Sequence, residues 1–308
     1  MEDHKMYDIG IIGGGTAGLT SAIYGQRAGK QTIVFEGANY GGQIVFSPHV
    51  ENYPGIASIS GAQYSMNLKE QAVNLGAETK QEQVEKVKAT DEGFVMVTSE
   101  GEYACRTVIL ATGVTHRPLG LEKEEKLTGA GISYCATCDG MFFRGRDVAV
   151  IGGGNTALQD AEFLSNYCNK VFLVHRRDEF RGDAKNVEAL KEKENVEFVL
   201  NAVPKELIGD MMVEGLVVTD KLTGEDQKLD VAGIFVAIGH LPKNEIFAEL
   251  VELDEAGFIR AGEDCLTSKP GVFVAGDCRT KEVRQLTTAA ADGAVAALAA
   301  VKYIAETR

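Results

Sequence analysis

The feature that most constrains this chain is a strand, glycine turn and helix pattern that occurs twice. The first copy has an apolar run at 7–12 followed by Gly-Gly-Gly-Thr-Ala-Gly at 13–18. The second has an apolar run at 147–151 followed by Gly-Gly-Gly-Asn-Thr-Ala at 152–157. In each, helical spacing of apolar residues comes next. Such glycines allow a tight turn and let a pyrophosphate reach the positive end of the helix. Two dinucleotide-binding sites are therefore predicted.

The residue that ends the next strand distinguishes the two sites. In the first copy it is Glu36, whose carboxylate can accept hydrogen bonds from ribose hydroxyls. In the second it is His175, followed by Arg176, Arg177 and Arg181. Guanidinium groups bind a 2′-phosphate, which a carboxylate would repel. The second site is predicted to prefer NADPH over NADH; the alternative is a solvated charge cluster at a strand end.

Each copy also closes in the same way, which indicates a duplicated fold. A buried strand ends in Gly113 in the first copy and in Gly239 in the second, and a proline-bearing connector follows each. We therefore expect an α/β chain of two Rossmann-like, three-layer domains, with the second inserted into the first. The expected ranges are 1–117 and 246–308 for the first domain and 118–245 for the second.

The segment after the insertion must complete the first domain. A buried strand ends at Gly276-Asp277, and an alanine-rich helix is predicted from 287 to 303. A carboxylate at this strand end, beside the first nucleotide site, can bind a ribityl hydroxyl. Strand-Gly-Asp turns are also common without any ligand.

Composition excludes several classes of partner. The net charge of −14 would repel nucleic acid and anionic lipid. No apolar run approaches the roughly 20 residues needed to cross a bilayer, and the first residues do not resemble a signal peptide. We expect a cytoplasmic protein that binds neither nucleic acid nor a membrane.

Two of the six cysteines, Cys135 and Cys138, are separated by two residues. This spacing permits a small disulfide or half of a metal site and does not decide between them. The other four are expected to be buried small side chains; they are Cys105, Cys168, Cys265 and Cys278.

Taken together, these motifs resemble the low-molecular-weight thioredoxin reductases. The match runs along the whole chain, and its most specific part is Cys-Ala-Thr-Cys-Asp-Gly at 135–140, just before the second fingerprint. The resemblance implies FAD in the first domain, NADPH in the inserted one, a homodimer, and thioredoxin or a similar dithiol protein as electron acceptor. It also implies that Cys135 and Cys138 form a redox-active disulfide.

The family pattern further implies the cofactor contacts. Val84, in a short segment between helix and sheet, is expected to meet the adenine of FAD through its backbone. The other implied FAD residues are Gly13, Gly14, Gly15, Thr16, Ala17, Glu36, Gly37, Gly42, Gln43, Asn52, Ala111, Thr112, Gly113, Gly276, Asp277, Arg284, Gln285 and Leu286. The implied NADPH residues are Gly154, Asn155, Thr156, His175, Arg176, Arg177, Arg181, Ile238 and Gly239.

By analogy with the family, Cys138 faces the flavin and Cys135 attacks the partner. Asp139 is the candidate acid that protonates a leaving thiolate, or else a turn aspartate. One arrangement cannot serve nicotinamide, cysteines and partner together, so the inserted domain is expected to rotate at the two connectors. The apolar run 141–143 is expected in a loop, either docking the partner or packing between domains.

Two further classes of function compete with a reductase. A flavin dithiol oxidase would run the same cysteines in the opposite direction with oxygen, but it would not need the arginines that select NADPH. A non-enzymatic flavin redox sensor, or a zinc-binding module, would use the cysteines without catalysis. No second Cys/His pair with ligand spacing accompanies them, so no metal site is expected.

Overall fold

The structure is a computed structural model that describes residues 5–47 and 49–307. It divides into two compact units: unit 1 comprises Met1–Thr115 and Leu241–Arg308, and unit 2 comprises His116–His240. The two boundaries between the units, at 115/116 and 240/241, fall inside the proline-bearing connectors. The sequence-based domain boundaries followed residues 117 and 245. The strands at the two crossings, β7 (Val114–His116) and β16 (His240–Pro242), form a two-stranded sheet.

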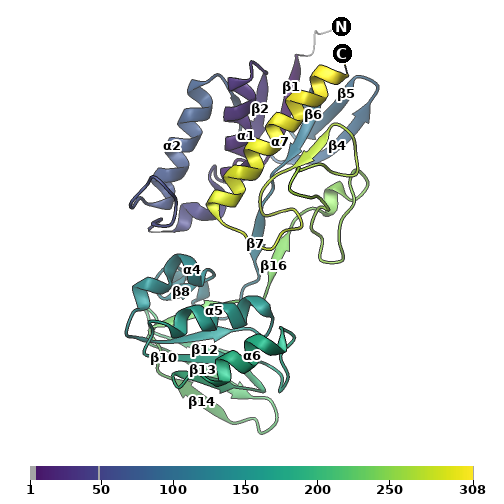
Figure 1. Ribbon diagram of the computed structural model, residues 1–308. Helices are drawn as coiled ribbons and strands as arrows, with labels where there is room; N and C mark the ends of the chain where they lie inside the picture. Colours follow the sequence, from purple (N-terminus) through teal and green to yellow (C-terminus); the bar gives the residue numbers. More distant parts are fainter. Residues whose placement is uncertain (1–4, 48, 308) are drawn as a thin grey trace. The chain divides into compact units, whose positions relative to one another are not determined.

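Unit 1 is built on a seven-stranded sheet with the order β3-β2-β1-β6-β5-β4, in which β17 also pairs with β6 (Figure 1). The pairs among β3, β2, β1, β6 and β17 are parallel, whereas β4 and β5 add an antiparallel hairpin. Its elements are β1 (Met6–Ile12), α1 (Thr16–Arg27), β2 (Thr32–Phe35), η1 (Gly42–Phe46), α2 (Gly61–Asn74), β3 (Glu78–Lys80), β4 (Val84–Thr90), β5 (Gly93–Thr98), β6 (Glu102–Leu110), η3 (Glu245–Phe247), β17 (Val272–Val274) and α7 (Leu286–Glu306).

Alternation along β1 separates two cores in unit 1. Ile9 and Ile11 point to the face covered by α1 and α7, which lie side by side (Figure 1). Ile12 belongs to the core on the opposite face, with β4, β5 and the segment around η3. Successive side chains of a strand point to opposite faces, so a continuously apolar strand must be covered on both sides. The result is a three-layer unit.

Unit 2 repeats this plan with different strands. A parallel five-stranded sheet has the order β11-β10-β9-β15-β8, and a separate antiparallel sheet has the order β12-β13-β14. Its elements are α3 (Glu124–Leu127), β8 (Ile132–Ser133), α4 (Ala136–Asp139), η2 (Gly140–Phe143), β9 (Asp147–Ile151), α5 (Asn155–Ser165), β10 (Lys170–Val174), α6 (Ala184–Lys191), β11 (Val196–Val199), β12 (Ala202–Ile208), β13 (Gly215–Asp220), β14 (Asp226–Leu229) and β15 (Gly233–Val236).

The central strand β9 shows why unit 2 also has three layers. Val148 and Val150 pack with residues of α5 and α6, whereas Ala149 and Ile151 pack with residues of the antiparallel sheet. The expected fold class, two Rossmann-like α/β units, is confirmed.

Helix α7 departs from one expectation. It is long and apolar enough to cross a membrane by length and composition, although the sequence was expected to have no such run. Its small residues are buried where it packs against α1, β6 and β17, and Asp292 is buried on the same face. In this structure one face of α7 packs into the core of unit 1, and 39% of its apolar window is buried.

Three local expectations are corrected. Val84 begins β4 inside the sheet and does not lie in a segment before it, because its side chain belongs to the unit 1 core. The buried strand that was expected to end in Gly113 ends earlier, at Leu110, and β1 pairs with this strand, β6, along most of its length. The run 141–143 lies in the 3-10 helix η2 and not in a loop.

Candidate functional site

Cys135 and Cys138 are joined by a disulfide. Cys135 is the N-cap of α4, and its carbonyl accepts hydrogen bonds from the backbone N–H groups of Cys138 at 3.2 Å and Asp139 at 3.1 Å. One helical turn therefore brings the two sulfurs together. Within residues 5–47 and 49–307, no group of three or more His, Cys, Asp or Glu side chains is arranged to hold a metal ion. Of the two chemistries that the spacing permits, the structure contains the disulfide.

Ser133 links the disulfide to Asp139. Its hydroxyl donates a hydrogen bond of 2.7 Å to Asp139 Oδ2 and accepts one of 3.0 Å from the backbone N–H of Cys135. Both contacts are made from the end of the buried strand β8. The Asp139 carboxylate is thereby tied, through Ser133, to the backbone of Cys135. Ser133 was not predicted as a site residue, because serine before a turn is common.

The first glycine fingerprint has the geometry of a nucleotide site. Gly13 has a φ of 112°, and a Cβ there would collide with the carbonyl of Ala111. Gly15, the N-cap of α1, is different: its φ is negative, and a Cβ would meet only the carbonyl of Gly41, at 3.8 Å. The fold therefore does not itself require glycine at 15, whereas a pyrophosphate approaching the helix N-terminus would.

Glu36 is held where its carboxylate can meet a ribose. It follows β2 and accepts hydrogen bonds of 2.8 Å from the backbone N–H groups of Gly14 and Ala38. The predicted acid is thus attached to the fingerprint itself. Asn52 and Gln285, which are 233 positions apart, also meet through a 3.2 Å hydrogen bond from Asn52 Nδ2 to Gln285 Oε1. Gln285 in turn caps α7, and Leu286 begins that helix.

The carboxylate of Asp277 has a buried oxygen whose hydrogen bonding the described part of the chain does not satisfy. Its Oδ1 atom is buried and has no hydrogen-bond partner among the described residues. Burial raises the pKa of Asp277, and the positive charges of Lys281 and Arg284 oppose part of that shift. A buried carboxylate oxygen without a donor is costly, so it fits a ligand that brings a hydroxyl. The ribityl chain of a flavin has such hydroxyls.

Other implied flavin residues have structural partners. The Gln43 side-chain amide donates to the carbonyl of Val114 at 2.9 Å, and the Thr112 hydroxyl donates to Asn244 Oδ1 at 2.9 Å. Arg284 donates to the carbonyl of Asp277 at 3.3 Å and stacks over Phe258. Asn244, which is fully buried, was not identified from the sequence, because its partner lies 132 positions away.

The second fingerprint repeats the glycine argument. Gly154, the N-cap of α5, has extended backbone, and a Cβ there would meet nothing within 4 Å. Asn155 Oδ1 accepts a hydrogen bond of 2.7 Å from the backbone N–H of Asp183, and the backbone N–H of Arg181 donates to the carbonyl of Gly153 at 2.8 Å. These bonds hold the segment that carries Arg181 against the open turn.

His175 and the three arginines that follow it differ in their exposure to solvent. Arg176, Arg177 and Arg181 are exposed, whereas His175 is 4% exposed. The His175 ring lies against Gly153, stacks on Phe180 and contacts the carbonyl of Glu179 at 3.1 Å. Burial lowers the pKa of His175. This geometry gives it a packing role behind the fingerprint and leaves the guanidinium groups to meet an anion.

Comparison with known proteins identifies the family. The model of the pyridine nucleotide-disulphide oxidoreductase family matches residues 7–293. The chain belongs to this family. A thioredoxin reductase of Mycolicibacterium smegmatis is 42% identical over 303 residues, which cover 98% of this chain and 97% of the relative. The solved thioredoxin reductase of Streptococcus pyogenes has a TM-score of 0.93 at 35% identity and covers 99% of this chain and 100% of its own.

A third similar protein is the solved thioredoxin reductase of Giardia duodenalis, with a TM-score of 0.92 at 34% identity, covering 98% of this chain and 99% of its own. The predicted resemblance to thioredoxin reductases is confirmed. As a pyridine nucleotide-disulphide oxidoreductase, the chain is an enzyme that uses a flavin and a nicotinamide cofactor, and the Cys135–Cys138 disulfide fits its redox-active pair.

Proposed function

We propose that this chain is a thioredoxin reductase that passes electrons from NADPH through FAD and the Cys135–Cys138 pair to oxidised thioredoxin. The observation that carries the proposal is the disulfide on α4, in the same unit as a glycine fingerprint flanked by three exposed arginines. Gly15, Glu36 and the orphaned Asp277 oxygen support FAD in unit 1. Gly154 and the arginines support NADPH in unit 2.

The exchange with thioredoxin follows from the chemistry of two neighbouring thiols. A bound flavin would supply a carrier that takes an electron pair from the nicotinamide and reduces the Cys135–Cys138 disulfide to a dithiol. The Cys135 thiolate then attacks one sulfur of the thioredoxin disulfide, which breaks that bond and forms a mixed disulfide. The Cys138 thiolate attacks Cys135 Sγ, so that the Cys135–Cys138 bond forms again and the second thioredoxin sulfur leaves.

Asp139 and Ser133 have a role in this exchange because each leaving thiolate takes up a proton. Asp139 adjoins Cys138 in the same helical turn and is oriented by the Ser133 hydroxyl. We assign to Asp139 the delivery of that proton. Since the pair must meet both the flavin and a protein, we also propose that unit 2 rotates at the two connectors during turnover.

We further infer a homodimer and a cytoplasmic location. Support for the dimer comes from Val295 and Leu298, apolar side chains that α7 leaves exposed. Leu298→Glu is expected to lower the mass measured by sedimentation to that of a monomer. The location is supported by the free thiols of the other four cysteines, all buried, which persist in a reducing compartment.

Anaerobic titration tests the proposed reaction. NADPH is expected to bleach the yellow flavin protein fully at two equivalents per flavin, because the flavin and the Cys135–Cys138 disulfide each take one electron pair, and oxidised thioredoxin is expected to restore the colour. In Cys135→Ser and Cys138→Ser variants, NADPH should still bleach the flavin but thioredoxin should not restore it. Restoration by oxygen alone, with no response to thioredoxin, would instead identify a dithiol oxidase.

A further inference from the structure

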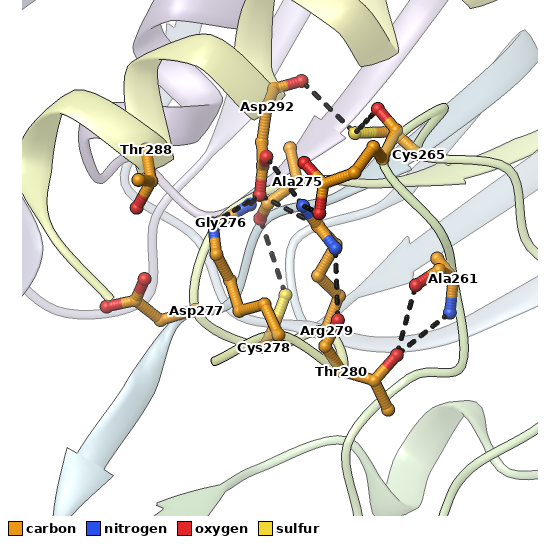
Figure 2. A network of polar contacts seen from close by, with 12 residues as sticks. Ala261, Cys265, Ala275, Gly276, Asp277, Cys278, Arg279, Thr280, Thr288 and Asp292 are labelled. Carbon is orange, nitrogen blue, oxygen red and sulfur yellow. Dashed lines mark hydrogen bonds and ion pairs between the residues drawn. The ribbon is translucent and has the colours of Figure 1, made fainter. Parts of the chain in front are cut away.

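Unit 1 contains a buried charge cluster formed by Arg279, Lys281 and Asp292, and Figure 2 labels Arg279 and Asp292. Arg279 is 1% exposed and Asp292 is 4% exposed. Arg279 makes two hydrogen bonds to the Asp292 carboxylate, from Nε to Oδ2 at 2.9 Å and from Nη2 to Oδ1 at 3.0 Å. Lys281 Nζ adds a third contact, at 2.8 Å to Oδ2. The two-point contact between Arg279 and Asp292 fixes their relative orientation.

The Asp292 carboxylate accepts hydrogen bonds from several residues of the turn that follows β17. Besides the two side chains, its Oδ2 accepts a 2.9 Å hydrogen bond from the backbone N–H of Gly276, where φ is 84°. One carboxylate on α7 therefore holds Gly276, Arg279 and Lys281, which span the turn from its first residue to its last. Burial alone would raise the pKa of Asp292, but hydrogen bonds from Arg279 and Lys281 outweigh it, so this pKa lies below its ordinary value.

Burying three charged side chains is energetically unfavourable if their only role is to pack the core. Each buried ion carries a large desolvation penalty, and apolar side chains of similar size often stabilise a core better. The surrounding face of α7 is made of alanine and glycine, so nothing in the helix itself calls for a carboxylate. The cluster needs an explanation other than core stability.

The turn that the cluster holds carries Asp277. Figure 2 shows that no dashed contact reaches the Asp277 carboxylate, which lies on the side of Thr288. Its Oδ1 is buried and is one of three buried side-chain atoms without a hydrogen-bond partner among the described residues. Two cations face one carboxylate within the cluster, and Glu263, which also contacts Arg279 at 3.1 Å, is almost fully exposed. Asp277 is therefore in the same turn as two buried cations, Arg279 and Lys281, that share a single buried carboxylate.

We propose that Arg279, Lys281 and Asp292 position Asp277 to bind the polyhydroxyl chain of the flavin, so that they set cofactor affinity through Asp277. The inference rests on the proposed FAD site in unit 1. None of the three cluster residues need touch the cofactor. They are positioning residues that keep a buried acceptor in place before a hydroxyl arrives.

A double-mutant cycle on the deflavinated full-length chain tests this. FAD is titrated into the wild type and the Asp277→Asn, Asp292→Asn and doubly substituted variants, and the dissociation constant is measured by fluorescence. Each single substitution is expected to weaken FAD binding at least tenfold, with no further loss in the double variant, because both act on one contact. Losses that multiply, or an unchanged dissociation constant for Asp292→Asn, would overturn the proposal.

Two controls separate positioning from stability. Ile304→Ala removes a buried side chain from the same helix, and it should lower the free energy of unfolding while leaving FAD affinity unchanged. If Asp292→Asn does not fold, Lys281→Met takes its place in the cycle with the same expected coupling, and Lys281→Arg should restore affinity. If the wild-type protein binds no FAD, the proposed function itself is refuted. If the wild type binds FAD tightly but the effects of the two substitutions multiply, only the positioning role is refuted.

Discussion

The phenol of Tyr134 donates a hydrogen bond of 2.8 Å to Glu124, and Tyr134 directly precedes the redox-active Cys135. The Glu124 carboxylate is buried and also accepts hydrogen bonds from the backbone N–H groups of Leu119 at 2.7 Å and Gly120 at 2.8 Å. One side chain therefore joins the segment that enters unit 2 to the segment that carries the disulfide.

Removing this carboxylate should be costly. Glu124→Ala leaves three backbone donors, Leu121 included, and one phenol without their acceptor, so we expect the free energy of unfolding to fall by about 2–4 kcal/mol. Tyr134→Phe removes a single hydrogen bond and should cost about 1 kcal/mol. Urea unfolding measures both. The neighbouring Glu125 is exposed, and Glu125→Ala is the matched control. Equal stability of the two alanine variants would contradict the prediction.

The exposed arginines should govern the choice of nicotinamide cofactor. A charge-assisted hydrogen bond contributes about 1.5–3 kcal/mol, so replacing Arg176, Arg177 or Arg181 by alanine should raise KM for NADPH roughly 10- to 100-fold. KM for NADH should stay within about twofold, since that cofactor has no 2′-phosphate. Steady-state kinetics with both cofactors checks this. Arg146→Ala, an exposed arginine elsewhere in unit 2, serves as control. A parallel rise for both cofactors would refute the assignment.

Local sequence patterns were enough to predict the central strands and both glycine fingerprints. The predicted strand at 147–151 and the one expected to end at His175 are both observed, because apolar runs bounded by turns determine them locally. Contacts between distant residues were not predictable in this way. Asp292 stands in an alanine-rich helix, and its partner Arg279 is recognised only when the chain is folded. His175 occupies the expected position, but its burial depends on Phe180 and Gly153. A charged residue inside an apolar helix face was a usable signal for Asp292.

His116 should make stability depend on pH. Its ring stacks on Tyr134 at 4.6 Å and lies 5.0 Å from His240, and burial, together with charge on His240, lowers its pKa from 6.5 to about 4. The unfolded chain then binds a proton at higher pH than the folded chain does. Stability from this site is therefore full above pH 6.5 and is lost as pH falls toward 4, by about 2 kcal/mol at pH 5.

The substitution His116→Phe keeps an aromatic ring against Tyr134 and removes the titrating group. Urea unfolding of this variant should show a smaller loss of stability between pH 7.5 and 5 than the wild type shows. His49 is exposed, so His49→Gln should leave the wild-type pH dependence in place. Identical pH profiles for His116→Phe and the wild type would rule out this role.

Phe142 and Phe143, which the sequence grouped together, have different surroundings. The Phe143 ring contacts Phe235 edge to face at 5.3 Å and fills the space over Gly233. Phe142 is 46% exposed and Met141 is 51% exposed. Phe143 therefore packs inside unit 2, and these contacts are not the packing between domains that the sequence-based alternative expected. The docking interpretation fits Met141 and Phe142, which lie one short turn from the disulfide.

Alanine substitutions should separate these two roles. Phe142→Ala is expected to raise KM for thioredoxin about tenfold, since aromatic side chains contribute strongly at protein interfaces, and to leave KM for a small disulfide dye unchanged. Phe143→Ala should instead lower the free energy of unfolding by about 3 kcal/mol because it opens a cavity under β15. Kinetics with both acceptors and urea unfolding of both variants test this. If Phe142→Ala raised KM for the dye as much as for thioredoxin, the residue would act on the disulfide itself and not on partner docking.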